Sequence, residues 1–162
     1  MSKNQYMEKI GIKAKIASEE LSALSIKKRN DVLKQFCIYL KKNKKLFLKA
    51  NQIDVLKAKK IKNSMLDRLK LDNLKINQII NSVEKIINLK DPLGKTLALW
   101  KRPNGLTIKR ISIPVGIIGV IYESRPNVTS DVSSLCFKAG NAVILRGGSE
   151  ALRSNRLLSD LF

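Results

Sequence analysis

Two short polar segments carry the side chains best suited to chemistry, and each follows an apolar run. The first, Glu123-Ser124-Arg125-Pro126-Asn127, comes directly after IIGVIY. Arg125 offers a fork of N–H donors for a carboxylate or a phosphate, and the amide of Asn127 is suited to stabilising a developing oxyanion. The residues alone leave two interpretations open: a ligand-binding loop, or a solvated connection between a strand and a helix.

The second polar segment, Arg146-Gly147-Gly148-Ser149-Glu150, begins at the end of the apolar run AVILR. Free backbone N–H groups at the start of a following helix would favour an anion such as a cofactor phosphate. The alternative is that Ser149 only caps the helix and the glycines only form the turn. The spacing is not G-x-G-x-x-G, so the dinucleotide fingerprint is absent.

The residues that the sequence lacks narrow the possible chemistry. There is no histidine, which excludes a hydrolase of the Ser-His or Cys-His type within these 162 residues. Cys37 and Cys136 fit no metal-ligand spacing and no disulfide framework, and both have apolar neighbours. We therefore predict that both cysteines are inert core residues and that the chain holds no metal site.

The formal charge of +19 would attract nucleic acid, anionic lipid and phosphorylated metabolites alike. The lysines are scattered, however, and aromatic residues that could stack on bases make up only 5% of the chain. Ile and Asn are also abundant and share AT-rich codons with Lys. Genome composition therefore explains the charge better than a nucleic-acid function, and we expect no specific nucleic-acid partner.

The elements that position the two polar segments fall into three regions. Residues 1–90 are predicted to be helical, with one long helix, two or three shorter ones, and Ser64 as the N-cap of a short helix over MLDRLKL. Residues 96–113 are predicted to form an extended hairpin. The helical region rests on apolar residues at helical spacing: Val32, Leu33, Phe36, Tyr39 and Leu40, then Ile79, Ile80, Val83, Ile86 and Ile87.

Residues 114–162 are predicted to form a β-α-β-α core. The runs IIGVIY and AVILR are typical of buried parallel strands. A helix from about Thr129 to Lys138 would connect them and end at Gly140-Asn141. Because the carboxyl ends of parallel strands meet at one edge of a sheet, both polar segments would lie at the edge where open α/β sheets bind ligands.

The location follows from what the chain does not contain. No apolar run approaches the roughly 20 residues needed to cross a bilayer. The N-terminus lacks the apolar core of a signal peptide. We expect a cytoplasmic protein with no membrane partner.

The run IPVGIIGVIYESRPNVTSD, followed by GNAVILRGGSEA, resembles the signature region of γ-glutamyl phosphate reductases almost residue for residue. The resemblance extends back through DPLG and MLDRL to GIKAKIASEELSALS, in family order. These enzymes are related to aldehyde dehydrogenases. The resemblance implies an α/β fold in which N-terminal helices precede part of a parallel Rossmann-like sheet, incomplete and aldehyde dehydrogenase-like. Residues 1–162 would be the N-terminal portion of the NADP-binding domain.

The resemblance also implies an activity, the NADPH-dependent reduction of L-glutamyl 5-phosphate to L-glutamate 5-semialdehyde in proline biosynthesis. A cysteine thiolate expels phosphate, and NADPH delivers hydride to the thioester. Asn127 then resembles the oxyanion-stabilising asparagine of the superfamily, and Arg125 is a candidate substrate contact. The cofactor's adenosine ribose and phosphate would be contacted by Arg146, Gly147, Gly148, Ser149 and Glu150, with Arg146 suited to the 2′-phosphate.

The family's catalytic cysteine belongs to a later domain, so the resemblance implies that the catalytic domain is absent from these residues. Three hypotheses remain: a truncated reductase that is inactive alone, one half of a split enzyme completed by a C-terminal chain, or a basic non-catalytic module that binds nucleic acid or another anion. Glutamate 5-kinase is a further candidate partner. The hairpin resembles the segment through which dehydrogenase relatives associate, which leaves a family-type homo-oligomer open.

Overall fold

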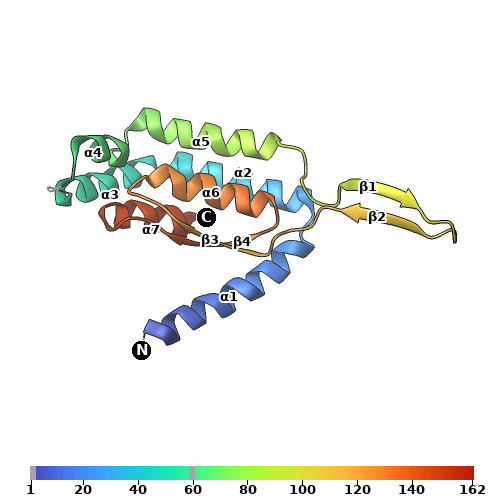
Figure 1. Cartoon of the computed structure of the whole chain (residues 1–162). Helices are drawn as coiled ribbons and strands as arrows, with labels where there is room; N and C mark the ends of the chain where they lie inside the picture. The colour runs from blue at the N-terminus through green and yellow to red at the C-terminus, as the bar shows by residue number, and fades with distance from the viewer. Residues whose placement is uncertain (1–2, 59–60) are drawn as a thin grey trace.

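The computed structural model describes residues 3–58 and 61–162 (Figure 1). The helices of the first half are α1 (Lys3–Ala23), α2 (Ile26–Lys42), α3 (Lys44–Lys57), α4 (Asn63–Leu69) and α5 (Asn73–Asn88). They are followed by β1 (Thr96–Lys101), β2 (Thr107–Ile111), β3 (Ile117–Ile121), α6 (Pro126–Lys138), β4 (Ala142–Arg146), the short 3-10 turn η1 (Ser149–Ala151) and α7 (Leu152–Leu161). Helices α6 and α7 lie between the α2–α3–α5 layer and the β3–β4 pair, and α1 packs against that pair as well.

Polar cap residues divide the helical region more finely than the sequence predicted. In the described residues, α1, α2 and α5 are all long, at 21, 17 and 16 residues, so the expectation of one long helix was wrong. Ser25 caps α2 by accepting a hydrogen bond from the amide of Lys28, and a single residue, Asn43, separates α2 from α3. A polar cap can therefore end a helix where no glycine or proline does.

The predicted Ser64 cap was also wrong. Helix α4 already begins at Asn63, and the residue before it, Lys62, makes no side-chain cap bond. The next helix, α5, does have a polar cap, because the Asp72 carboxylate accepts from the amide of Lys75 at 2.7 Å. The predicted cap was therefore placed two residues too late, inside the helix.

The main core joins α2, α3, α5 and α7. It is built from Leu33, Phe36, Cys37, Leu40, Phe47, Ile76, Ile79, Ile80, Val83, Ile86 and Leu158. Both apolar stripes predicted from the sequence contribute to this list. Each fully buried side chain of this size contributes about 1.5–3 kcal/mol relative to exposure, so this cluster is the main source of stability for the helical layer.

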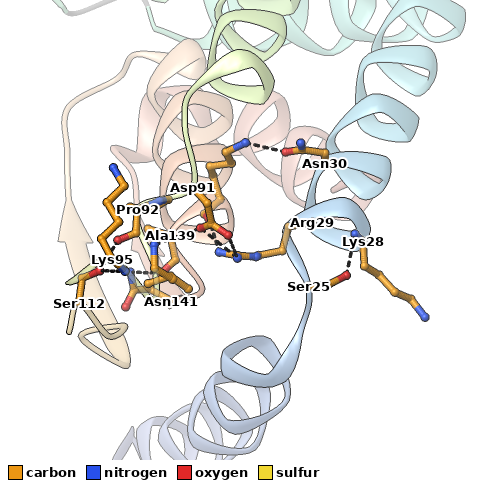
Figure 2. Close-up of polar contacts among 12 residues, drawn as sticks. Ser25, Lys28, Arg29, Asn30, Asp91, Pro92, Lys95, Ser112, Ala139 and Asn141 are labelled. Atoms are coloured by element: carbon orange, nitrogen blue, oxygen red, sulfur yellow. Dashed lines mark hydrogen bonds and ion pairs between the residues drawn. The ribbon is translucent and has the colours of Figure 1, made fainter. Parts of the chain in front are cut away.

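A buried ion pair fastens the helical layer to the second half of the chain. Arg29 of α2 is 2% exposed, and its Nη2 contacts both carboxylate oxygens of Asp91, at 3.1 and 2.8 Å (Figure 2). Its Nη1 donates to the carbonyl of Lys138, the last residue of α6, at 2.6 Å. The Lys138 ammonium is buried nearby and donates to Asn30, so the DPLG segment, α2 and α6 meet at one junction.

The parallel pair β3–β4 and the helix between them agree with the predicted β-α-β unit, but the prediction of buried strands was wrong for β3, where Ile117 is 40% and Ile121 81% exposed. Ile117 pairs with Ala142 and Ile121 with Arg146, with no shift in register. Helix α6 ends where predicted. Gly140 has a φ of +69°, and the amides of Gly140 and Asn141 donate to the carbonyls of Phe137 and Cys136. This is the paired hydrogen-bond pattern of a glycine-terminated helix.

The predicted hairpin is present and projects from the body as a two-stranded ribbon (Figure 1). Strands β1 and β2 are antiparallel, with Thr96 opposite Ile111 and Lys101 opposite Thr107. Its apolar side chains are exposed, with Leu97 at 56%, Leu99 at 58% and Trp100 at 43%. A ribbon with apolar groups in water is typical of a surface that packs against something else.

Candidate functional site

The two polar segments lie side by side, as the strand pattern predicted. Ile121 and Arg146 are register partners at the carboxyl ends of β3 and β4. The pairing continues for one more residue, because the amide of Tyr122 donates to the carbonyl of Arg146 at 3.0 Å. The segments that follow both strands therefore emerge at the same edge of the sheet, where ligands bind in open α/β folds.

A direct side-chain contact links the two segments. The hydroxyl of Ser124 donates to Oε2 of Glu150 at 2.6 Å, and Ser124 is 2% exposed. This hydrogen bond, followed by those from the backbone amide of Glu150 and from Ser149, lowers the pKa of the Glu150 carboxyl. Glu150 is therefore held as a fixed, ionised acceptor at the end of β4.

Gly147 and Gly148 are required by close approach and not by backbone conformation. A Cβ on Gly147 would overlap the Asn155 amide and come within 2.9 Å of the Tyr122 ring. A Cβ on Gly148 would come within 2.6 Å of Ser124 Oγ and 2.8 Å of Glu150 Oε2. Neither glycine has a positive φ. The glycines therefore let two strand ends and the start of α7 pack within contact distance.

The second segment borders a shallow depression of about 620 Å³. Arg146, Gly147, Gly148 and Ser149 line it, while Glu150 lines a neighbouring depression between α3 and α7. Arg146 is exposed, and its guanidinium has no hydrogen-bond or ion-pair partner in residues 3–58 and 61–162. An unpaired guanidinium beside two glycines is suited to an anionic group such as a phosphate.

Two amides in the first turn of α7 already have an internal acceptor. The carboxylate of Asp54, on α3, accepts from the amides of Arg153 and Ser154 at 3.2 and 2.8 Å, and from the Ser154 hydroxyl at 2.8 Å. Asp54 is 4% exposed and occupies the position that an anion would take. Asp54 therefore satisfies the amides of Arg153 and Ser154. The sequence placed the helix start earlier, at Ser149 and Glu150, and a phosphate site on the amides there stays a prediction.

The first segment differs from its expected loop, because α6 begins at Pro126 and not near Thr129. Proline suits the first helical position, since its missing N–H would have no partner there. Asn127 thus lies in the first turn of α6, and its Nδ2 donates to Asp131 Oδ2 at 3.3 Å. The role of Asn127 in stabilising an oxyanion stays a prediction. Arg125 lies just before the helix, with its Nη2 3.9 Å from Glu123 Oε2.

Arg125 and Asn127 border a second pocket, of about 620 Å³, between α6 and the α4–α5 pair. Asp67 and Arg68, from the MLDRL motif, also line it. The five expected cofactor residues are not among its lining. The candidate site residues therefore line three depressions: this pocket, the depression after β4, and the one between α3 and α7.

Sequence reasoning missed Ser124, Asp54, Arg68 and Asp131. The MLDRL motif, although noted, was given no role in binding. Ser124 and Glu150 both belong to predicted segments, so the meeting of parallel strand ends was a usable signal for their contact. Asp54 carried no local signal, because its partner Ser154 is 100 residues away.

Neither cysteine lies at this site. Cys37 and Cys136 are 4% and 8% exposed. Burial, and next the charge of Glu84, raise the pKa of Cys37, and burial raises the pKa of Cys136. Both thiols are therefore protonated at neutral pH and poorly nucleophilic, in agreement with the predicted core role.

No group of three or more His, Cys, Asp or Glu side chains in residues 3–58 and 61–162 is placed to hold a metal ion. Across the same ranges, no helix has the length and apolar character needed to span a membrane.

The fold defines the class of protein. The crystal structure of an acetylating aldehyde dehydrogenase from Geobacillus thermoglucosidasius matches 97% of this chain and 32% of that one, with a TM-score of 0.67 at 16% identity. At this identity the match shows the fold alone. The chain has an α/β fold of the aldehyde dehydrogenase type and covers only part of it, as the sequence predicted. No family model matches the chain.

Closer relatives identify the family. The crystal structure of γ-glutamyl phosphate reductase from Thermotoga maritima matches 92% of this chain and 36% of that one, at 41% identity and a TM-score of 0.89. γ-Glutamyl phosphate reductase from Bartonella tribocorum is 47% identical over 151 residues, 92% of this chain and 37% of that protein. The chain belongs to the γ-glutamyl phosphate reductase family and corresponds to its N-terminal part. It spans just over a third of the length of these relatives.

Proposed function

We propose that this chain forms the N-terminal, NADPH-binding part of an enzyme that reduces L-glutamyl 5-phosphate to L-glutamate 5-semialdehyde in proline biosynthesis. The observation that carries the proposal is the meeting of two family segments at one sheet edge, where Ser124 bonds to Glu150 next to the unpaired Arg146. A cytoplasmic location remains a prediction from the sequence.

The residues after β4 fit a phosphorylated dinucleotide. Arg146 is an exposed cation without an internal partner, which suits the 2′-phosphate of NADP. Glu150 is an ionised acceptor of fixed orientation, which suits ribose hydroxyls. Gly147 and Gly148 keep this edge free of side chains, and Ser149 adds an exposed hydroxyl. When bound, the nicotinamide cofactor supplies the hydride.

The nucleophilic thiolate has to come from outside these 162 residues, because both cysteines are buried with raised pKa values. The thiolate would form a thioester with the γ-acyl group as phosphate leaves, and hydride transfer would then release the aldehyde and return the thiolate. We propose that residues 1–162 alone are catalytically inactive. An intact mass above 18.2 kDa in native cells would place the thiol on the same chain, and a mass of 18.2 kDa would require a complementing C-terminal chain.

The exposed apolar hairpin supports association of this chain with a partner. Its ribbon projects from the body, so it can reach a second subunit (Figure 1). We assign it to a family-type homo-oligomer. Glutamate 5-kinase stays a candidate partner predicted from the resemblance.

The cofactor assignment is tested by titrating the chain with NADPH and with NADH and following the change in fluorescence. We expect NADPH to bind more tightly. Arg146→Gln should weaken NADPH binding about tenfold, the effect of losing a hydrogen bond to a charged group, with little change for NADH. The matched control is Arg110→Gln, an exposed arginine on β2. An unchanged ratio of NADPH to NADH affinity in Arg146→Gln would contradict the assignment.

A further inference from the structure

The pocket between α6 and the α4–α5 pair has a composition that the cofactor assignment does not explain. It is about 620 Å³, within the range of small-molecule sites. Its lining combines cationic and anionic side chains from segments far apart in the chain, Asp67, Arg68 and Lys75 on one side and Arg125, Asn127 and Asp131 on the other.

Two guanidinium groups of this pocket converge on one carboxylate oxygen. Arg68 Nη1 lies 3.2 Å from Glu123 Oε2, and Arg125 Nη2 lies 3.9 Å from the same atom. The Glu123 side chain is 60% exposed and does not line the pocket, so it is an exposed counter-ion that a ligand could replace. The Nε of Arg125 is buried without a hydrogen-bond partner among the described residues. The two arginines are thus placed to share a carboxylate from a ligand.

Asp131 provides the opposite charge. Its Oδ2 accepts from Asn127 at 3.3 Å, and its Oδ1 is buried without a partner among the described residues. The nearest cationic candidate on α5, Lys75, already donates to the carbonyls of Asp67 and Lys70, at 2.6 and 2.7 Å. No ion pair within residues 3–58 and 61–162 neutralises Asp131. Burial accordingly raises the pKa of its carboxyl.

We propose that this pocket binds the α-amino-acid end of the γ-glutamyl substrate, with the α-carboxylate held by Arg68 and Arg125 and the α-ammonium held by Asp131. The identity of the substrate rests on the proposed function, whereas the preference for a zwitterion rests on the pocket's own charges.

The charge pattern separates a zwitterion from simpler ligands. The arginines would attract a phosphate or a dicarboxylate, but the carboxylate of Asp131 would repel it. Asp131 would attract a simple amine, but the arginines would repel it. Only a ligand that carries both charges on one carbon, as the α-amino-acid end of glutamate does, satisfies both ends of the proposed site. Arg125 directly follows Ser124, whose hydroxyl contacts Glu150, so such a ligand would lie close to the cofactor segment.

The ligand class is tested by calorimetry and two-dimensional amide NMR on the chain with four probes: L-glutamate, glutarate, 4-aminobutyrate and inorganic phosphate. Glutarate lacks the ammonium and 4-aminobutyrate lacks the α-carboxylate. We expect L-glutamate to bind about tenfold more tightly than either analogue. Its binding should shift the amide resonances of α4, α5 and the start of α6. Equal or tighter binding of glutarate or phosphate would show a simple anion site and overturn the proposal, as would no binding of L-glutamate.

Three variants assign the roles. Asp131→Asn should lower L-glutamate affinity about tenfold, to the level of glutarate, and leave glutarate binding unchanged or tighter. Arg68→Gln and Arg125→Gln should weaken both ligands. Arg68 is an exposed residue whose only side-chain partner in the described residues is exposed Glu123, so its variant keeps the test valid if another fails to fold. Arg110→Gln is the matched control.

Failure of the amino-acid pocket can be distinguished from failure of the proposed cofactor site. Loss of NADPH binding with intact L-glutamate selectivity would remove the proposed cofactor site and leave the amino-acid pocket standing. NADPH binding with an unchanged ratio of L-glutamate to glutarate affinity in Asp131→Asn would overturn the amino-acid pocket alone.

Discussion

The hydroxyl of Ser124 lies 2.6 Å from the carboxylate of Glu150, and this hydrogen bond ties the end of β3 to the turn that follows β4. Ser124 is buried, whereas Glu150 is only partly so. The orientation of a residue in the proposed cofactor site is therefore determined by the neighbouring segment, which also leads to the amino-acid pocket.

Ser124→Ala should raise the pKa of the Glu150 carboxyl toward its ordinary value, because the Ser124 hydrogen bond is the main cause of its lowering. The measurement is an NMR titration of the side-chain carboxyl carbon. Ser18→Ala removes a hydroxyl that bonds only within α1 and should leave that titration unchanged. An unshifted pKa in Ser124→Ala would mean that the backbone amide and Ser149 suffice to hold the charge.

Gly148→Ala should destabilise the chain by about 1–3 kcal/mol and weaken NADPH binding, because the new methyl group meets Ser124 Oγ and Glu150 Oε2. Denaturant unfolding and the fluorescence titration measure the two effects. Gly119→Ala is the control: it lies in β3, and nothing lies within 4 Å of its added Cβ. Equal effects of the two variants would show that the close approach at Gly148 is not needed.

Asp131→Asn should stabilise the chain at neutral pH. The folded-state pKa of Asp131 is raised by burial, so the folded chain binds its proton more tightly than the unfolded chain does. Stability is therefore lost as pH rises from the unfolded pKa through the folded pKa, and asparagine escapes this loss. The melting temperatures of wild type and variant should converge below about pH 4 and separate above it. A difference independent of pH would contradict this origin.

Asp91→Asn should cost about 2–4 kcal/mol, because it leaves the guanidinium of Arg29 buried without its counter-ion. Urea unfolding at neutral pH measures the loss. Glu84→Gln breaks an ion pair with Lys41 in which both side chains are about half exposed, and it should cost less than about 1 kcal/mol. Similar losses in both variants would show that the Arg29 pair contributes no more than a surface pair.

Replacing Leu97 and Leu99 together by lysine should shift the chain toward the monomer in sedimentation experiments if the hairpin binds a second copy. Both side chains are more than half exposed, so folding should be unaffected. Leu56→Lys, an exposed leucine on α3, is the matched control. A wild-type chain that sediments as a monomer would contradict association through this ribbon.

The regular elements of this chain were largely predictable from local patterns. The two apolar runs form β3 and β4, and Gly140-Asn141 ends α6, because runs of β-branched apolar residues and glycine termination leave signals within a few neighbouring residues. Helix starts were less predictable. The Ser64 cap and the start of α6 near Thr129 were wrong, since a cap depends on which of several adjacent residues adopts the extended conformation.

The candidate site was predictable only where its residues belong to the two polar segments. Arg68 joins Arg125 from 57 residues away, and no local pattern marks that meeting. Asp54 was equally unpredictable from local sequence, although the amides at a helix start do attract anions. The anion that they attract here is a side chain of α3.

Through that contact, α3 affects ligand binding at residues 146–150, the proposed cofactor segment, although α3 itself touches no ligand. About a hundred residues separate Asp54 from the amides that donate to it, so the docking of α3 and the conformation at the start of α7 stabilise each other. A ligand that binds only the ordered segment therefore adds its binding free energy to the docking of α3. Conversely, a local opening that releases α3 abolishes the binding conformation at the end of β4, however intact the strands remain.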